Sequence, residues 1–140
     1  MVRKSDIKIL EILMKNARTS YVKIAEELGV SEAAIRKRIR RLENEGVILR
    51  YTIEVNPKKL GFEIVSIIGI DTKPERFISI ISQLKEMEEI KKAFSSSGDH
   101  MILIETWFKN SDELEAFIKK LESIEGVTRV CPAIILERLK

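Results

Sequence analysis

Residues 24–46 of the 140-residue chain, IAEELGVSEAAIRKRIRRLENEG, decide how its first half folds. The stretch holds two helical patterns with a short connection between them, in which Gly29 ends the first helix and Ser31 caps the second. Such a short connection makes the two helices cross steeply and leaves the outer face of the second one exposed. The pattern therefore predicts a helix-turn-helix, whose second helix enters the major groove of DNA.

The second helix of this motif, predicted over residues 31–45, has one apolar face and one basic face. Its apolar residues recur at helical spacing and are expected to face a core: Ile35, Ile39 and Leu42. At about 100° per residue, the opposite face carries Ala33, Arg36, Lys37, Arg40 and Arg41. Arg36 and Lys37 can donate to guanine, whereas Arg40 and Arg41 are better placed for phosphates. The alternative is a three-helix core with a basic exterior and no DNA partner.

The remaining patterns of the first half complete a small domain. A first helix is predicted after the cap at Ser5-Asp6, and a second covers residues 22–28. Tyr21, near its start, could contact a phosphate through its hydroxyl or fill the core. Residues 47–55 alternate in polarity and predict the strand of a wing, and residues 56–61 form a Pro- and Gly-marked hinge. The first domain is thus predicted to be a winged helix-turn-helix of three helices and a strand, residues 1–60.

Residues 61–140 predict a second domain with an internal repeat. Strands are expected over residues 62–71, 90–95, 100–108 and 127–136, with helices after Pro74 and after the cap at Asn110. The order βαββαβ is the ferredoxin-like arrangement, so the whole chain is placed in the α+β class. Both helices cover one face of the sheet, yet residues 101–104 and the pair Ile67-Ile68 place apolar groups on both sides of their strands. An uncovered apolar sheet face implies a partner, most simply a second copy in a homodimer.

Charge and composition limit the functions open to the chain. Residues 1–60 carry a net charge of +6 and residues 61–140 a net charge of −3, which suggests a polyanion as the partner of the first module. A single cysteine and a single histidine exclude an internal disulfide and leave little for a metal site. No nucleophile, phosphate loop or metal spacing supports catalysis, so an enzyme is not expected. With no signal peptide or membrane segment, we expect a cytoplasmic, nucleoid-associated protein.

Several motifs in a fixed order resemble the Lrp/AsnC (leucine-responsive regulatory protein, feast/famine) family of transcription regulators, especially its archaeal members. They are D-x-x-I-L-x-I-L from Asp6, N-A-R-T from Asn16, I-A-x-x-L-G-V-S-E-A-A-I-R-K-R-I from Ile24, L-E-x-x-G-V-I from Leu42, N-P-x-x-L-G-F from Asn56, S-G-D-H from Ser97 and I-x-G-V-x-x-V-C-P-A-I-I-L-E from Ile124. The resemblance covers essentially the whole chain. It implies a regulator that binds double-stranded DNA as a dimer, assembles further into tetramers or octamers, and in many members senses an amino acid.

The resemblance also assigns sites. The base-reading positions fall on Ser31, Ala33, Ala34 and Lys37. The effector site falls on the turn at residues 97–101, which are Ser97, Gly98, Asp99, His100 and Met101. There Asp99 could pair with an ammonium group, and exposed N–H groups could bind a carboxylate. The alternative is an ordinary hairpin turn. Many members carry polar residues where this chain has Met101, Val130 and Pro132, which predicts either no effector or an unusual one. No other cofactor is expected.

The leading hypothesis is therefore a sequence-specific, oligomeric DNA-binding transcription regulator, for which an amino acid is a candidate effector. One alternative is an architectural chromatin-type protein that contacts DNA without reading bases and has no effector. Another is a small-molecule-binding ferredoxin-like module with an incidental basic helix. The target genes, the operator, the direction of regulation and the final oligomer size lie beyond the sequence.

Overall fold

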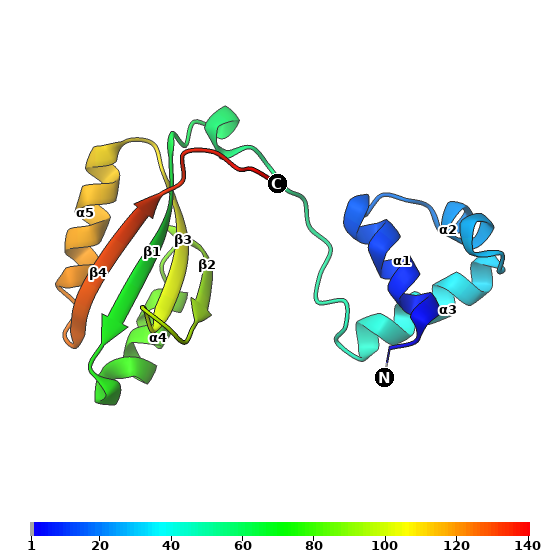
Figure 1. Ribbon diagram of the computed structural model, residues 1–140, viewed down its shortest axis with the longest axis horizontal. Coiled ribbons are helices and arrows are strands. Elements are labelled where there is room, and N and C mark those ends of the chain that lie inside the picture. The colour runs from blue at the N-terminus through cyan, green and yellow to red at the C-terminus, as the bar shows by residue number, and fades with distance from the viewer. Residues whose placement is uncertain (1) are drawn as a thin grey trace. The chain divides into compact units, whose positions relative to one another are not determined.

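A computed structural model describes residues 2–140, which divide into two compact units. The first unit ends at Glu54 and the second begins at Val55. The elements of the first are α1 (Lys4–Lys15), α2 (Tyr21–Leu28) and α3 (Glu32–Asn44) (Figure 1). Those of the second are a 3-10 turn (Pro57–Leu60), β1 (Ile64–Thr72), a second 3-10 turn (Pro74–Arg76), α4 (Phe77–Lys85), β2 (Ile90–Ser95), β3 (Ile102–Phe108), α5 (Ser111–Glu122) and β4 (Val127–Ile134).

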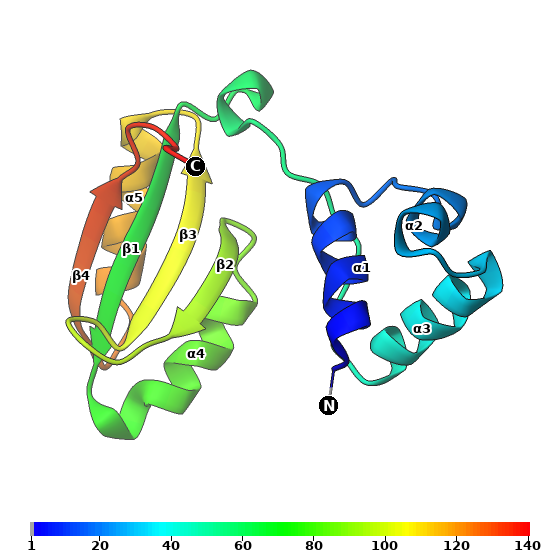
Figure 2. The same cartoon turned by 45° about the vertical axis from the view of Figure 1, so that its right-hand side comes forward.

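The N-terminal unit is a three-helix domain built around one apolar cluster. Its buried side chains come from all three helices: Ile9, Ile24, Ala25, Ile35, Ile39 and Leu42. Serine caps begin two of the helices, because the Ser20 hydroxyl accepts from Lys23 N and the Ser31 hydroxyl accepts from Ala34 N. Gly29 ends α2 in the left-handed conformation, with φ 66°, and lets α3 leave at a steep angle (Figure 2).

The start of α1 differs from the sequence prediction. Arg3, not the Ser5-Asp6 pair, occupies the N-cap, and Asp6 lies in the first turn of the helix. Its carboxylate accepts from Arg3 N at 3.1 Å, which closes the turn from inside. The predicted cap is therefore wrong: Asp6 acts from the third residue of the helix, where its side chain accepts from the backbone of the N-cap residue.

The predicted wing strand over residues 47–55 is wrong for this structure. These residues form no ladder with any strand of the described chain. Strand geometry needs a hydrogen-bonding neighbour, and no other strand lies in the N-terminal unit. The segment instead runs exposed, with Leu49 88% and Ile53 80% accessible.

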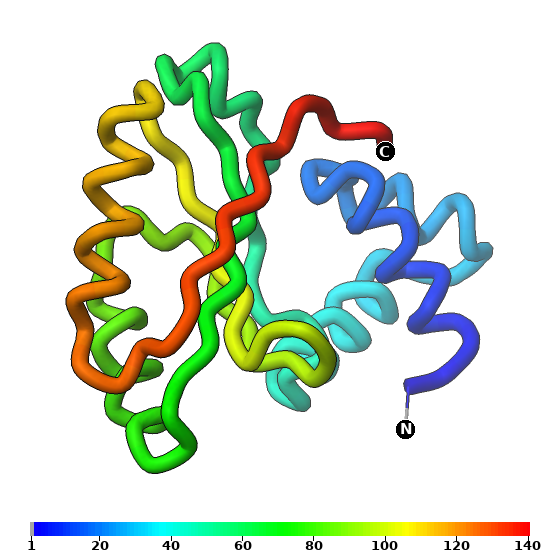
Figure 3. Tube along the Cα trace, turned by 60° about the vertical axis from the view of Figure 1, so that its left-hand side comes forward, coloured from blue at the N-terminus to red at the C-terminus, as the bar shows by residue number. Residues whose placement is uncertain are grey.

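The C-terminal unit confirms the predicted βαββαβ order. Its strands form one antiparallel sheet in the order β2-β3-β1-β4, and α4 and α5 lie together on one face (Figure 3). Alternation along β1 and β3 sends Ile68, Ile70, Ile102 and Ile104 into the core beneath the helices. Ser66 and Thr106 are also buried there and satisfy each other through hydroxyl groups 2.7 Å apart.

The opposite face of the sheet has no helix over it within the C-terminal unit. Cross-strand pairing places Val65 beside Trp107 and Gly69 beside Leu103 on this open face. Val65, Leu103 and Trp107 are half-buried, and Phe62 packs its ring 5.8 Å from that of Trp107. The open face therefore carries apolar groups along the two central strands, with one charged residue, Glu105, opposite Ile67.

Candidate nucleic-acid interface and effector turn

The buried side of α3 determines which of its side chains face solvent. Ile35, Ile39 and Leu42 are at most 1% exposed and hold the helix on the core. Ser31, Ala33, Lys37 and Arg40 are exposed on the other side. Ala34 is half-buried. The outward stripe of α3, Ser31, Ala33, Lys37 and Arg40, thus begins with small residues and ends with two cations.

The two cations of this stripe are available to a ligand. Neither Lys37 nor Arg40 makes an ion pair or a side-chain hydrogen bond with another residue between positions 2 and 140. Small residues at the leading end of a helix let its backbone approach base edges, and long cations behind them can reach bases or phosphates. The stripe has the chemistry that a duplex groove requires.

Arg36 lies beside the stripe, between α3 and α2. Its Nη2 donates to Glu32 Oε1 at 2.8 Å, and its guanidinium carbon lies 5.2 Å from the centre of the Tyr21 ring. Stacking on an aromatic face and pairing with a carboxylate restrict the rotamers of an arginine. Tyr21 is therefore an aromatic support for Arg36, and the structure does not bring its ring into the buried apolar cluster, against which it only packs from the edge.

Arg41, which the sequence places among the phosphate contacts, turns back toward the protein. Its Nη2 donates to Asp6 Oδ2 at 2.6 Å, and its Nε lies 3.9 Å from Glu45 Oε1. The sequence did not reveal Asp6 as the partner of Arg41, because the two residues are 35 positions apart and the position of Asp6 suggested a helix cap. The only signal available was a carboxylate one helical turn before Ile9, on the apolar side of the helix.

The connection after α3 is tied to that helix by backbone hydrogen bonds from Val47 N and Ile48 N to the Leu42 carbonyl and by one side-chain hydrogen bond. Tyr51 donates its hydroxyl proton to Glu43 Oε1 at 2.7 Å. Partial burial, this hydrogen bond and the negative charge of Glu43 raise the pKa of Tyr51 to about 12. The phenol therefore stays protonated and keeps donating throughout the neutral range.

The turn between β2 and β3 separates into an exposed tip and an anchored end. Ser97, Gly98 and Asp99 are exposed, and Gly98 has φ 113°, which a residue with a side chain rarely adopts. His100 and Met101 are half-buried and belong to the anchored end. The five residues predicted as an effector site thus lie close in space, but only the tip is open to solvent.

Asp71 of β1 holds the anchored end. Its Oδ2 lies 3.0 Å from His100 Nδ1, and its Oδ1 accepts from Met101 N at 3.0 Å. Burial alone raises the pKa of Asp71, but the hydrogen bonds from His100 and Met101 and the charges of His100 and Arg129 together lower it below its usual value. Asp71 is accordingly a carboxylate whose two oxygens are already engaged.

The His100 ring lies directly on Gly69. A Cβ atom built on Gly69 would come within 2.2 Å of His100 Cδ2, so only glycine fits beneath the imidazole. Neither Gly69 nor Asp71 was singled out by the sequence, although both belong to the strand predicted there. A glycine inside a β pattern is the signal that marks such a close approach.

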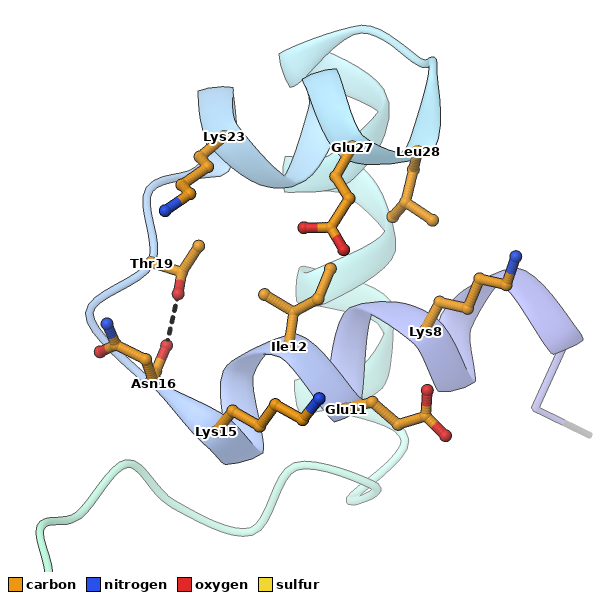
Figure 4. Close-up of a pocket in the computed structure, with 9 residues that line it drawn as sticks. All are labelled: Lys8, Glu11, Ile12, Lys15, Asn16, Thr19, Lys23, Glu27 and Leu28. Carbon is orange, nitrogen blue, oxygen red and sulfur yellow. Dashed lines mark hydrogen bonds between the residues drawn. The ribbon is translucent and has the colours of Figure 1, made fainter.

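A groove of about 480 Å³ lies between α1 and α2. Figure 4 shows lysine and glutamate side chains around it, with Ile12 and Leu28 from the two helices. None of the predicted DNA-binding residues lines it. Within residues 2–140, no group of three or more His, Cys, Asp or Glu side chains could hold a metal ion, and no helix is long and apolar enough to cross a membrane.

Comparison with known proteins identifies both units. Residues 2–48 match the family model described as winged helix-turn-helix DNA-binding, and residues 65–140 match the model described as Lrp/AsnC ligand binding domain. The chain is 51% identical over 141 residues to the HTH-type transcriptional regulator LrpA of Pyrococcus abyssi, covering 100% of both chains. It is 38% identical over 134 residues to LrpA1 of Halobacterium salinarum, covering 95% of this chain and 94% of that protein.

Solved structures agree with the sequence matches. The structure of AsnC from E. coli has a TM-score of 0.87 at 30% identity and covers 100% of this chain and 95% of that one. The fold is thereby confirmed as a winged helix-turn-helix of three helices followed by a βαββαβ domain. With a full-length relative at 51% identity and family models on both units, the chain belongs to the Lrp/AsnC family of HTH-type transcriptional regulators, which are DNA-binding proteins and not enzymes.

Proposed function

We propose that this regulator reads a specific DNA sequence through the outward stripe of α3, as a homodimer or a larger assembly of dimers on the cytoplasmic chromosome. Residues 1–60 would supply the DNA contacts, and residues 61–140 would supply the dimer contacts and the effector site. The observation that carries the proposal is the stripe itself, where Lys37 and Arg40 are exposed and without a protein partner among the described residues.

Base reading is assigned to the leading part of α3. Ser31, Ala33 and Ala34 let the helix approach the base edges, and Lys37 follows them along the helix at the depth where a cation meets guanine O6 and N7. Arg36 enters the same groove from the α2 side, restrained by Tyr21 and Glu32. Arg40 is placed for a phosphate, which fixes the register of the helix and carries no sequence information.

The dimer is assigned to the open face of the sheet. One helix-turn-helix makes few base contacts, whereas a two-fold dimer reads two half-sites about 34 Å apart or a multiple of it. The half-buried apolar groups of β1 and β3, with Val65 and Trp107 side by side, fit a second copy of the same face. Further assembly of dimers into tetramers or octamers is part of the proposal.

The effector, where one acts, is assigned to the exposed tip Ser97-Gly98-Asp99. Asp99 is the free carboxylate of the turn, since Asp71 already binds His100 and Met101 N. An amino acid would then pair its ammonium group with Asp99 and its carboxylate with N–H groups of the turn. His100 and Met101, which Asp71 holds in place, would line the buried side of this effector site.

Selection of bound duplexes from a random pool, followed by footprinting, tests the function. The wild-type protein should select a palindromic site, and Lys37→Gln should select a different base at the position that Lys37 reads. Lys8→Gln, which changes an exposed lysine of α1, is the matched control and should select the wild-type site. If Lys37→Gln weakens every duplex equally and no consensus emerges, the protein is an architectural DNA-binding protein instead.

A further inference from the structure

Asp6 is the only fully buried ionisable side chain among residues 2–140. Its Oδ2 accepts from Arg3 N at 3.1 Å and from Arg41 Nη2 at 2.6 Å, whereas its Oδ1 has no hydrogen-bond partner in the described chain. A buried carboxylate is costly unless a charge compensates it. Arg41 is therefore the group that makes Asp6 tolerable at this position.

The Asp6–Arg41 pair joins the beginning of α1 to the end of α3. In the part of the chain that the structure describes, no other hydrogen bond or ion pair links these two helices. Arg41 is one helical turn beyond Lys37, rotated about 40° from it toward α1. Its side chain is 33% exposed, and both polar contacts that it makes are with carboxylates of the same unit.

The apolar contacts of α3 determine which face of the helix is buried, but they leave its fine orientation to directional contacts. Ile35, Ile39 and Leu42 make non-directional contacts that allow small rotations and shifts. A hydrogen-bonded ion pair with a planar guanidinium is directional and permits one geometry. A small rotation of α3 would shift Lys37 relative to the base edges proposed for it, whereas a long exposed arginine such as Arg40 can still reach a phosphate, so the pair is placed where it controls base reading.

We propose that Asp6 and Arg41 are positioning residues for DNA recognition: their buried ion pair sets the orientation in which α3 is presented to the groove, and Arg41 is not itself a phosphate contact. This inference rests on the proposed function, because it concerns how the outward stripe of α3 reads DNA. It assigns to Asp6 a role in DNA sequence discrimination, although Asp6 touches no nucleotide.

Two quantities separate positioning from phosphate contact. A phosphate contact contributes equally to every duplex, and its loss lowers the slope of log K against log salt by about 0.9 per contact. A positioning residue acts through Lys37, so its loss lowers the affinity for the preferred duplex and leaves the affinity for other duplexes and the salt slope unchanged. We expect the ratio of the two affinities to fall about tenfold in Arg41→Gln.

The experiment compares two duplexes at several salt concentrations by fluorescence anisotropy. One duplex is the site that the wild-type protein selects, and the other has the same base composition in shuffled order. Arg40→Gln is the matched control, because Arg40 is exposed, lies on the same helix and has no partner in residues 2–140. It should lower the salt slope on both duplexes and leave the ratio nearly unchanged.

Arg41→Lys gives the sharpest readout. Lysine keeps the charge but lacks the planar fork that meets the Asp6 carboxylate. Under the proposal its affinity ratio falls as in Arg41→Gln, and its salt slope stays at the wild-type value. A wild-type ratio in Arg41→Lys together with a reduced slope in Arg41→Gln would overturn the proposal, since that result is the signature of a phosphate contact.

Asp6→Asn tests the other half of the pair. Asparagine keeps the size and can still accept from Arg3 N, but it releases the Arg41 guanidinium, which should add a non-specific contact and lower the ratio. Circular dichroism shows whether each variant folds, and Arg41→Lys decides the question if Asp6→Asn does not. A wild-type protein that binds both duplexes equally would refute the proposed function. A wild-type affinity ratio in every Asp6 and Arg41 variant would instead refute only the positioning role of this ion pair.

Discussion

Gly69→Ala is expected to destabilise the C-terminal unit by pushing the His100 imidazole off the sheet. The added Cβ would lie 2.2, 2.4 and 2.7 Å from His100 Cδ2, Cγ and Nε2. Carbon atoms in contact are ordinarily about 3.5–4.0 Å apart, so the ring has to retreat by more than about 1 Å. The backbone of Gly69 does not have a positive φ, so alanine meets no strain from its own backbone and the penalty is steric.

The size of the effect follows from three contributions. Overpacking at a well-packed position costs about 1–3 kcal/mol. Displacing the ring also breaks its hydrogen bond to Asp71 Oδ2, now 3.0 Å long, for a loss of about 0.5–1.5 kcal/mol. Replacing glycine in a strand regains about 0.5–1 kcal/mol because alanine loses less conformational entropy on folding. The free energy of unfolding should therefore fall by about 1–3 kcal/mol.

A double-mutant cycle identifies the ring as the cause. His100→Ala alone loses the hydrogen bond to Asp71, but it opens the space that the new Cβ needs, so Gly69→Ala should cost nothing further in that background. Urea unfolding at pH 7, followed by the fluorescence of Trp107, measures the C-terminal unit selectively, because Trp107 is the only tryptophan in the chain. Free energies that add within about 0.5 kcal/mol would refute the contact between Gly69 and His100.

The remaining predictions concern the caps, the pH dependence and the assembly. Ser31→Ala should lower the stability of the N-terminal unit by about 1 kcal/mol in thermal unfolding, with Ser31→Asp retaining most of it; equal losses in both variants would exclude capping. Because the pKa of Asp71 is lowered in the folded state, its stabilising effect is present above the unfolded value, near about pH 4, and is lost as the pH falls through the folded value. The stability difference between the wild type and Asp71→Asn should thus be largest at neutral pH and vanish in acid; a difference independent of pH would contradict this assignment. Leu103→Lys, on the open face, should shift sedimentation equilibrium toward the monomer, whereas Lys119→Gln, at an exposed position of α5 on the helix side of the sheet, should not; an unchanged mass would remove the open face as the dimer contact.

Local rules accounted for most of the architecture. The serines before α2 and α3, the glycine after α2 and the helical spacing of Ile35, Ile39 and Leu42 each act within a few residues, so one sequence reveals them. The alternation of β1 and β3 reflects burial on one face and is equally local. These are the elements whose boundaries the sequence predicted within about two residues.

Contacts between distant residues are what the sequence did not show. A helical projection places Arg41 on the basic side of α3, but it does not show that α1 brings a buried carboxylate to that side. In the same way, His100 and Asp71 are 29 residues apart and meet only because β1 and β3 are adjacent in the sheet. The helical projection placed Ser31, Ala33, Lys37 and Arg40 on the side of α3 that is exposed, while the distinction between free and engaged cations required the tertiary structure.

The wrong prediction of a strand over residues 47–55 also concerns a contact that a single sequence does not show. Here the proposed contact is with another subunit. Its odd-numbered residues are apolar, as in a strand with one covered face, and Leu49 and Ile53 nevertheless lie exposed. Alternation reflects the surroundings in which a segment functions, and those surroundings include other subunits. Apolar residues at every second position are typical of a strand. Where such a segment pairs with no strand of its own chain, its partner strand can come from a second copy of the protein. In the proposed dimer, one assembly would cover both the exposed connection and the apolar groups of the open sheet face.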